Sequence, residues 1–91
     1  MSDGLDGTWN VRRTGGLLPP LIGVRKRIEG THGETRLGPF PGVSFVVDGY
    51  SLRYRKPLHC FVDLLEPDGE HIRGRATFRG RQFGRFEMRR A

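Results

Sequence analysis

The residues of this chain that could do chemistry include two cations and two phenols on segments expected to form strands. Alternation along these strands places Arg13 and Lys26 on the faces that carry large apolar residues. A buried cation needs a polar partner, and the hydroxyls of Tyr50 and Tyr54 could supply one. Both cations also lie near expected strand ends and can equally reach solvent, which is what we expect of Lys26.

Groups for catalysis or metal binding form no pattern in this sequence. Cys60 is the only cysteine, so neither a disulfide within the chain nor a cysteine-based zinc site is expected. Asp63 and Glu66 are the nearest approach to an acid/base pair and carry no motif around them. None of the three histidines has the spacing of metal ligands: they are His32, His59 and His71. We therefore expect no metal, no cofactor and no assigned catalytic residue.

The chain is strongly basic, with a formal net charge of +6 in 91 residues. Such a balance suits nucleic acid, an anionic surface or an acidic ligand, although a GC-rich genome also favours arginine codons. Outward positions on neighbouring strands would gather a basic wall, made of Arg53, Arg55, Arg73, Arg75, Arg79, Arg85 and Arg89. Exposed aromatics would be expected among them in a single-strand binder, and Phe61 is the only candidate.

The whole chain from residue 7 onward reads as short strands separated by Gly- and Pro-containing turns. The clearest hairpin is centred on Asp48-Gly49, a pair typical of tight two-residue turns. Along residues 70–79, alternation directs Ile72, Gly74, Ala76 and Phe78 inward. The expected strands are 7–14, 22–29, 34–37, 43–47, 50–55, 58–65, 70–79 and 82–90.

No segment predicts a significant helix, and 91 residues are enough for one domain. Closure of the strands would remove the exposed sheet edges. We therefore predict an all-β fold, a small antiparallel meander barrel of about eight short strands. Residues 1–6 are expected to be a flexible leader, and residues 7–91 the barrel domain. Gly84 lies where a β-bulge would let Phe83 also reach the interior.

The two ends of the chain carry a short motif: Gly7-Thr8-Trp9 opens the first strand, and Arg89-Arg90 lies at the end of the last. This arrangement resembles the calycin barrels, which include lipocalins, fatty-acid-binding proteins and nitrobindins. The resemblance implies that the indole of Trp9 plugs one end of the barrel, with Arg90 or Arg89 packed over it. It also implies a small ligand, such as a carboxylate held by Arg13 and tyrosine hydroxyls. An axial histidine for haem stays open, although the longer N-terminal motif of nitrobindins is absent.

The loop between the first two strands is unusually apolar, with Leu17, Leu18 and Leu21 beside two prolines. We expect these leucines to line the barrel end opposite Trp9 or to contact a second subunit. Small inward residues would leave room for a ligand, unless the bulk of facing aromatics fills it. The expected ligand-binding residues are Arg13, Leu17, Leu18, Leu21, Phe45, Tyr54, Gly74 and Ala76.

Three functions follow from these features. The first is non-catalytic binding of a small hydrophobic or amphipathic molecule in a lipocalin-like barrel. The alternative is a basic module that binds RNA or another polyanion, and the third is an enzyme that uses the barrel mouth. A homodimer stays open. No apolar stretch approaches the ~20 residues that span a membrane, so the expected location is the cytoplasm.

Overall fold

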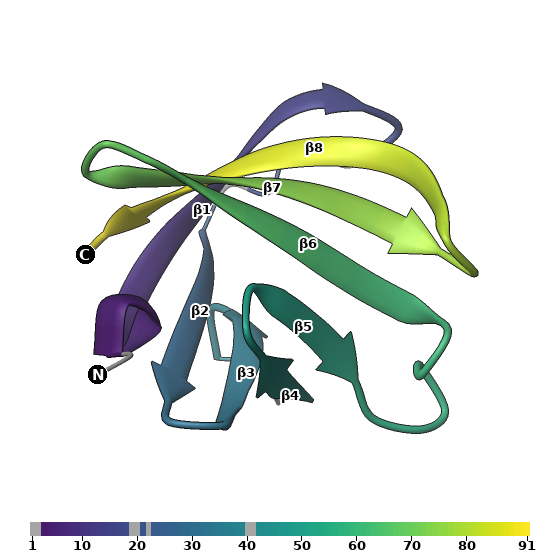
Figure 1. Ribbon diagram of the computed structural model, residues 1–91, viewed down its shortest axis with the longest axis horizontal. Helices are drawn as coiled ribbons and strands as arrows, with labels where there is room; N and C mark the ends of the chain where they lie inside the picture. Colours follow the sequence, from purple (N-terminus) through teal and green to yellow (C-terminus); the bar gives the residue numbers. More distant parts are fainter. Residues whose placement is uncertain (1–2, 19–20, 22, 40–41) are drawn as a thin grey trace.

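The computed structural model describes residues 3–18, 21, 23–39 and 42–91, and in them the chain forms eight strands (Figure 1). Apart from one turn of 3-10 helix, η1 (Asp3–Leu5), no helix occurs among these residues. The strands are β1 (Gly7–Gly16), β2 (Val24–Glu29), β3 (His32–Leu37), β4 (Val43–Asp48), β5 (Ser51–Tyr54), β6 (Phe61–Asp68), β7 (His71–Phe78) and β8 (Arg81–Arg90).

The strands form an antiparallel meander that closes on itself. Each strand pairs with the next in sequence, and β1 pairs with β8 from Trp9↔Arg90 to Gly16↔Gly84. Figure 1 shows the first and last strands side by side. Because every strand has two neighbours, the barrel has no free edge that could pair with another chain. The prediction of an all-β antiparallel barrel of eight strands is confirmed. No helix in the described part of the chain has the length and apolar character needed to cross a membrane.

The β4–β5 hairpin is present, but its turn lies one residue later than expected. Asp48 still pairs with Ser51, so the two turn residues are Gly49 and Tyr50. Gly49 has φ 62°, a left-handed conformation that glycine adopts without strain. The Tyr50 side chain is consequently 52% exposed, and its expected inward direction is wrong. Leu52 and Tyr54 do face the interior.

The core is a continuous cluster inside the barrel. Its largest fully buried side chains are Trp9, Phe45, Ile28, Leu52 and Met88. Leu5, expected in a flexible leader, is instead 6% exposed and belongs to this cluster. Turn η1 therefore folds against the end of the barrel that Trp9 occupies, which we call the plug end. The opposite end, where β1 finishes and β8 begins, is called the distal end.

A bulge interrupts the pairing of β7 with β8. Ala76 pairs with Gly84 and Thr77 with Gln82, which leaves Phe83 as the extra residue. Phe83 packs against the core, as the bulge predicted from the sequence requires. Strict alternation fails beyond this point: Thr77 is buried and donates a hydrogen bond to the Val62 carbonyl over 2.6 Å, whereas Phe78 is 41% exposed. The expected inward direction of Phe78 is therefore wrong.

Glycines let large side chains cross the barrel at close range. A Cβ added at Gly74 would lie 2.2 Å from the Phe86 ring, and one at Gly84 would lie 2.4 Å from Leu18. The space beside Gly74 is thus filled by Phe86, and not by Phe45 or Tyr54. Ala76 is itself a buried member of the core. In this barrel, small inward residues make room for neighbouring side chains.

Candidate functional site

A polar cluster lies inside the barrel, built from four strands. Lys26 on β2 donates hydrogen bonds to Thr35 Oγ1 on β3 over 2.8 Å and to Tyr54 OH on β5 over 2.7 Å. Its Nζ lies 3.1 Å from Asp63 Oδ2 on β6, and Tyr54 donates to the same oxygen over 3.0 Å. The Lys26 and Asp63 side chains are only 4% and 9% exposed. We call these residues the interior polar cluster.

The interior polar cluster is satisfied by its own members. Among the described residues, no buried side-chain nitrogen or oxygen lacks a hydrogen-bond partner. The Lys26 ammonium also lies 5.3–5.5 Å from the ring centroids of Phe45, Tyr54 and Phe86. A ligand carboxylate would have to displace Asp63 to reach this cation. The cluster is therefore suited to hold four strands in register, and not to bind a ligand.

Two members of the cluster have shifted pKa values. Burial alone would lower the pKa of Lys26, but the oxygens of Tyr54 and Asp63 outweigh it, and that pKa is raised above 10.5. Burial is the main reason that the pKa of Tyr54 is raised above 10.0, and Lys26 opposes the shift. In the folded protein both groups therefore keep their protons to a higher pH than in the unfolded chain.

Stability is expected to fall on the alkaline side because of these two groups. Their contribution is complete below about pH 10, where both side chains are protonated in the folded and unfolded states alike. As the pH rises further, the unfolded chain loses these protons first, and the contribution is lost as the pH passes the folded pKa values. Urea titrations at neutral pH and at pH values above 10 would measure the fall. Lys26→Met with Asp63→Leu should weaken it, and an equal fall in that variant would contradict the assignment.

Arg13 and Lys26 have the opposite environments to those expected: Arg13 was expected to face the interior and Lys26 to reach solvent. Arg13 is exposed and donates to the Leu18 carbonyl over 3.2 Å, so it does not reach the interior. Lys26 is buried because its face of β2 points into the barrel, where Tyr54 and Asp63 lie within hydrogen-bond distance of its ammonium. The alternation of Lys26 with Ile28 was the signal for burial. Nothing in the sequence marked Asp63 as its partner.

The plug end is built as a stacked pair. The Arg90 guanidinium carbon lies 4.3 Å from the Trp9 ring centroid. Arg90 also donates to the carbonyls of Asp6 over 2.7 Å and Gly4 over 3.0 Å. The Trp9 indole donates to the Leu5 carbonyl over 2.9 Å. Cation, indole and turn η1 thus close this end together.

The leucines of the β1–β2 loop have different environments. Leu17 is 85% exposed, whereas Leu18 and Leu21 pack against the core at the distal end. Leu18 fills the space over Gly84, and the Leu17 amide donates to the Phe83 carbonyl over 2.8 Å. The two prolines and Ile22 of this loop lie outside the described residues. Of the other expected ligand residues, Phe45 and Tyr54 are part of the packed interior.

Exposed apolar side chains gather at the distal end. Six large hydrophobic residues in the described part of the chain are exposed, and all except Tyr50 lie at this end. The five are Leu17, Leu37, Val43, Leu58 and Phe78. Each lies at or near a strand terminus there, so they are distributed around the mouth of the barrel. Exposed apolar residues mark an interaction site where they form a contiguous patch.

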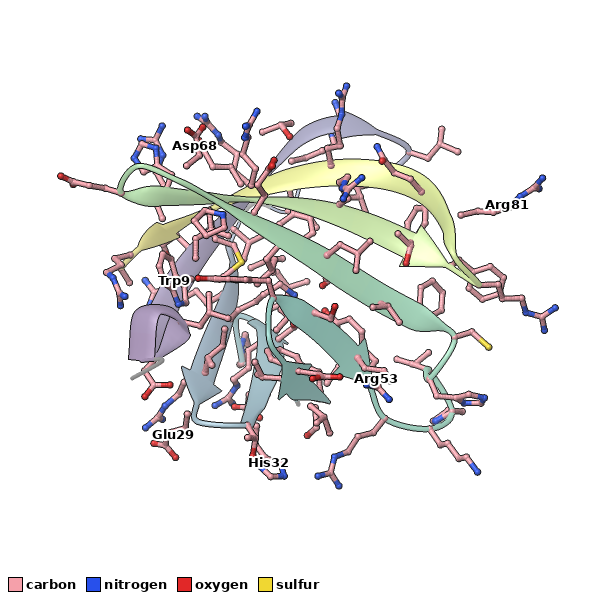
Figure 2. The ribbon with its side chains drawn as sticks, in the orientation of Figure 1. Trp9, Glu29, His32, Arg53, Asp68 and Arg81 are labelled. Atoms are coloured by element: carbon pink, nitrogen blue, oxygen red, sulfur yellow. The ribbon has the colours of Figure 1, made fainter. Side chains whose placement is uncertain are left out.

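A shallow, open apolar pocket of about 390 Å³ lies on the surface of the distal end. Three phenylalanines from β6, β7 and β8 form most of its wall, with Arg81 and Gln82 beside them. The Phe61 ring centroid lies 4.9 Å from that of Phe78 and 6.0 Å from that of Phe83. Figure 2 shows Arg81 projecting from this end of the barrel, with Trp9 toward the other. We call this set the phenylalanine pocket; from sequence, only Phe61 had been considered for binding.

Comparison with known proteins does not assign this chain to a family. No protein-family model matches the chain, and no curated protein or solved structure matches it significantly. Among the described residues, no three His, Cys, Asp or Glu side chains are grouped to hold a metal ion. Function therefore has to be argued from the phenylalanine pocket and the charged outer surface.

Proposed function

We propose that this protein is a non-catalytic binding protein that holds a small amphipathic molecule in the phenylalanine pocket. The observation that carries the proposal is the combination of three clustered aromatic rings with a cationic side chain at their edge. The phenylalanine side chains would contact the apolar part of the ligand, and Arg81 would form an ion pair with its acidic headgroup. The chemical class is thus an apolar molecule that ends in a carboxylate.

Because the barrel interior is filled by side chains, the proposed ligand site lies at the end of the barrel and not along its axis. Phe86, Leu18 and the interior polar cluster occupy the space that a roomy lipocalin-like cavity would need. The pocket volume lies at the lower end of the range for small-molecule sites, ~300–1,000 Å³. A ligand there would bury Phe78, which is otherwise 41% exposed. Burial of that ring supplies the favourable free energy of binding.

A relationship to the calycin barrels belongs to the same proposal. The eight-stranded meander and the stacking of Arg90 on Trp9 support it. The packed interior and the pocket at the distal end would then be the departures of this chain from a cavity-forming barrel. We also place the protein in the cytoplasm, where the lone thiol of Cys60 would stay reduced.

Phe78→Ser is expected to weaken the binding of a fluorescent fatty acid about tenfold, because it removes an aromatic wall of the pocket. Tyr50→Ser is the matched control, since Tyr50 is an exposed aromatic residue at the plug end. Fluorescence titration of both variants, with circular dichroism to verify the fold, measures the difference. Equal affinity in the two variants would contradict the proposed site.

Arg81→Gln tests the acidic headgroup. It should weaken binding of the fatty acid but leave binding of the corresponding alcohol unchanged, because only the acid can pair with the guanidinium. If instead no probe binds and Leu17→Ser converts a dimer to a monomer in sedimentation, the distal end is an interface between two copies. That result would replace the ligand proposal.

A further inference from the structure

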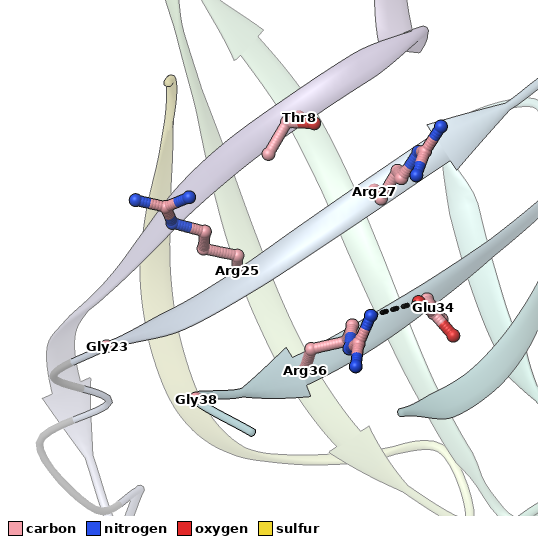
Figure 3. Close-up of a pocket in the computed structure, with 7 residues that line it drawn as sticks. All are labelled: Thr8, Gly23, Arg25, Arg27, Glu34, Arg36 and Gly38. Carbon is pink, nitrogen blue, oxygen red and sulfur yellow. Dashed lines mark ion pairs between the residues drawn. The ribbon is translucent and has the colours of Figure 1, made fainter. Parts of the chain in front are cut away.

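A shallow groove of about 500 Å³ runs over the outer surface of β1, β2 and β3 (Figure 3). Its lining includes Arg25, Arg27 and Arg36, with Thr8 from β1 and Glu34 as the acidic member. We call it the arginine groove. It lies outside the barrel wall and shares no lining residue with the phenylalanine pocket.

The strand register places one like-charged pair in this groove, beside the oppositely charged pair Arg27 and Glu34. Arg25 on β2 pairs directly with Arg36 on β3. On the other side of Arg25 the same row continues through Asn10 on β1 to Arg89 on β8. Like charges at directly opposite positions destabilise a sheet. Folding therefore does not explain why two arginines occupy this pair.

Acidic neighbours compensate the groove poorly. Arg36 Nη1 lies 3.7 Å from Glu34 Oε1, and Arg27 Nη2 lies 3.7 Å from Glu29 Oε2. Both ion pairs are solvent-exposed and therefore weak. Arg25 forms no ion pair with any residue that the structure describes. On β7 and β8, Arg73 contacts both Glu66 and Asp68, although Arg75 and Arg85 there are also directly opposite like charges. The hollow lined by those three arginines includes two glutamates, whereas the arginine groove includes one, so the arginine groove has the larger excess of positive charge.

We propose that the arginine groove binds the phosphate backbone of a nucleic acid. Guanidinium groups bind phosphate oxygens through paired N–H donors and stay charged at any physiological pH. Arg25 and Arg27 lie two residues apart on one strand face, about 6.7 Å along β2. Figure 3 shows the guanidiniums of Arg25 and Arg27 directed to different points along the strand. A row of phosphates matches this arrangement better than a single small anion does.

The described lining favours contact with phosphates over two other modes of recognition. Among the described residues, no aromatic side chain lines the groove for bases to stack on, and binding should be independent of sequence. The same part of the lining holds no large apolar side chain, whereas peripheral membrane binding uses apolar residues that enter the lipid. The backbone of a nucleic acid is the polyanion that fits both features.

The double variant Arg25→Gln/Arg36→Gln tests the proposal. Fluorescence anisotropy of a labelled single-stranded RNA and a labelled DNA duplex would be measured over a range of salt concentrations. Wild-type affinity should fall steeply as salt rises. In the variant, the log–log salt slope should shrink by ~1.4 for the single strand and ~1.8 for the duplex, because two phosphate contacts are lost.

Arg53→Gln/Arg73→Gln is the matched control. It also removes two positive charges, but from arginines that contact acidic residues outside the groove. It should keep the wild-type salt slope. Equal losses in both double variants would show a mere net-charge effect and overturn the site. Binding to vesicles containing an anionic phospholipid, without binding to either nucleic acid, would overturn it as well.

A melting curve separates binding from a structural role. Removal of Arg25 and Arg36 relieves repulsion between directly opposite cations, so Tm should stay level or rise by about a few degrees. A fall of several degrees would show that the pair supports the fold, and it would contradict the proposal. Because the groove and the phenylalanine pocket share no residue, failure at one site leaves the other unaffected.

Discussion

Replacement of Trp9 by alanine is expected to cost about 3–5 kcal/mol of the free energy of unfolding. Trp9 is 2% exposed, its ring is covered by Arg90, and its indole nitrogen holds the Leu5 carbonyl. The variant would lose both contacts and leave a cavity at the plug end. Since domains are stable by only about 5–15 kcal/mol, this loss is a large fraction of the total, and Trp9→Ala should unfold at a much lower urea concentration than the wild type.

Circular dichroism during urea titration measures this effect without needing the indole as a probe. Tyr50→Ala is the matched control, because Tyr50 is an exposed aromatic residue at the same end. It should change the free energy of unfolding by less than about 0.5 kcal/mol. A Trp9→Ala variant that unfolds at the wild-type urea concentration would show that the plug does not support the barrel.

Asp63→Ala should be comparably damaging, at about 3–5 kcal/mol, for an electrostatic reason. The substitution removes the carboxylate 3.1 Å from Lys26 Nζ and leaves a buried ammonium among aromatic rings. Tyr54 would also lose its acceptor, although its hydroxyl still has Thr35 Oγ1 at 3.0 Å. The unpaired cation therefore accounts for most of the expected loss.

Removal of both charges should restore the stability that is lost when Asp63 alone is replaced. Lys26→Met with Asp63→Leu replaces the ion pair by apolar side chains of similar volume, which is often neutral or stabilising. A double-mutant cycle in urea, with both single variants, measures the coupling energy. If the double variant is as unstable as Asp63→Ala, the loss comes from packing, and the buried charge is not its cause.

Much of the fold follows from local patterns that the sequence displays. Alternation from Ile72 to Ala76 directs these side chains to one face, and the structure buries both. Gly84 beside Phe83 predicted the bulge that the structure shows between β7 and β8. These patterns are readable because side chains alternate with period two and because glycine tolerates close approach. Shifts of one residue, as at Tyr50, escape such a reading because a turn can move along the chain without changing the pattern.

The candidate sites were less accessible to sequence reasoning. Phe61 and Phe78 meet because the register of β6 and β7 pairs them directly, and the bulge in β8 places Phe83 beside Phe61. The interior polar cluster depends on closure of the barrel, since only closure brings β2 near β6 across its interior. Neither Asp63 nor the aromatic trio carries a local motif, so pairwise spacing along the chain gives no sign of either site.

The sequence by itself determined the all-β class, the number of strands and the inward direction of most core residues, because these depend on short-range alternation and turn chemistry. Only the tertiary structure decided that Lys26 is buried and Arg13 exposed, since burial depends on which strands face one another across the barrel. It alone also set Arg25 opposite Arg36, because register is a property of two strands together and not of either sequence segment.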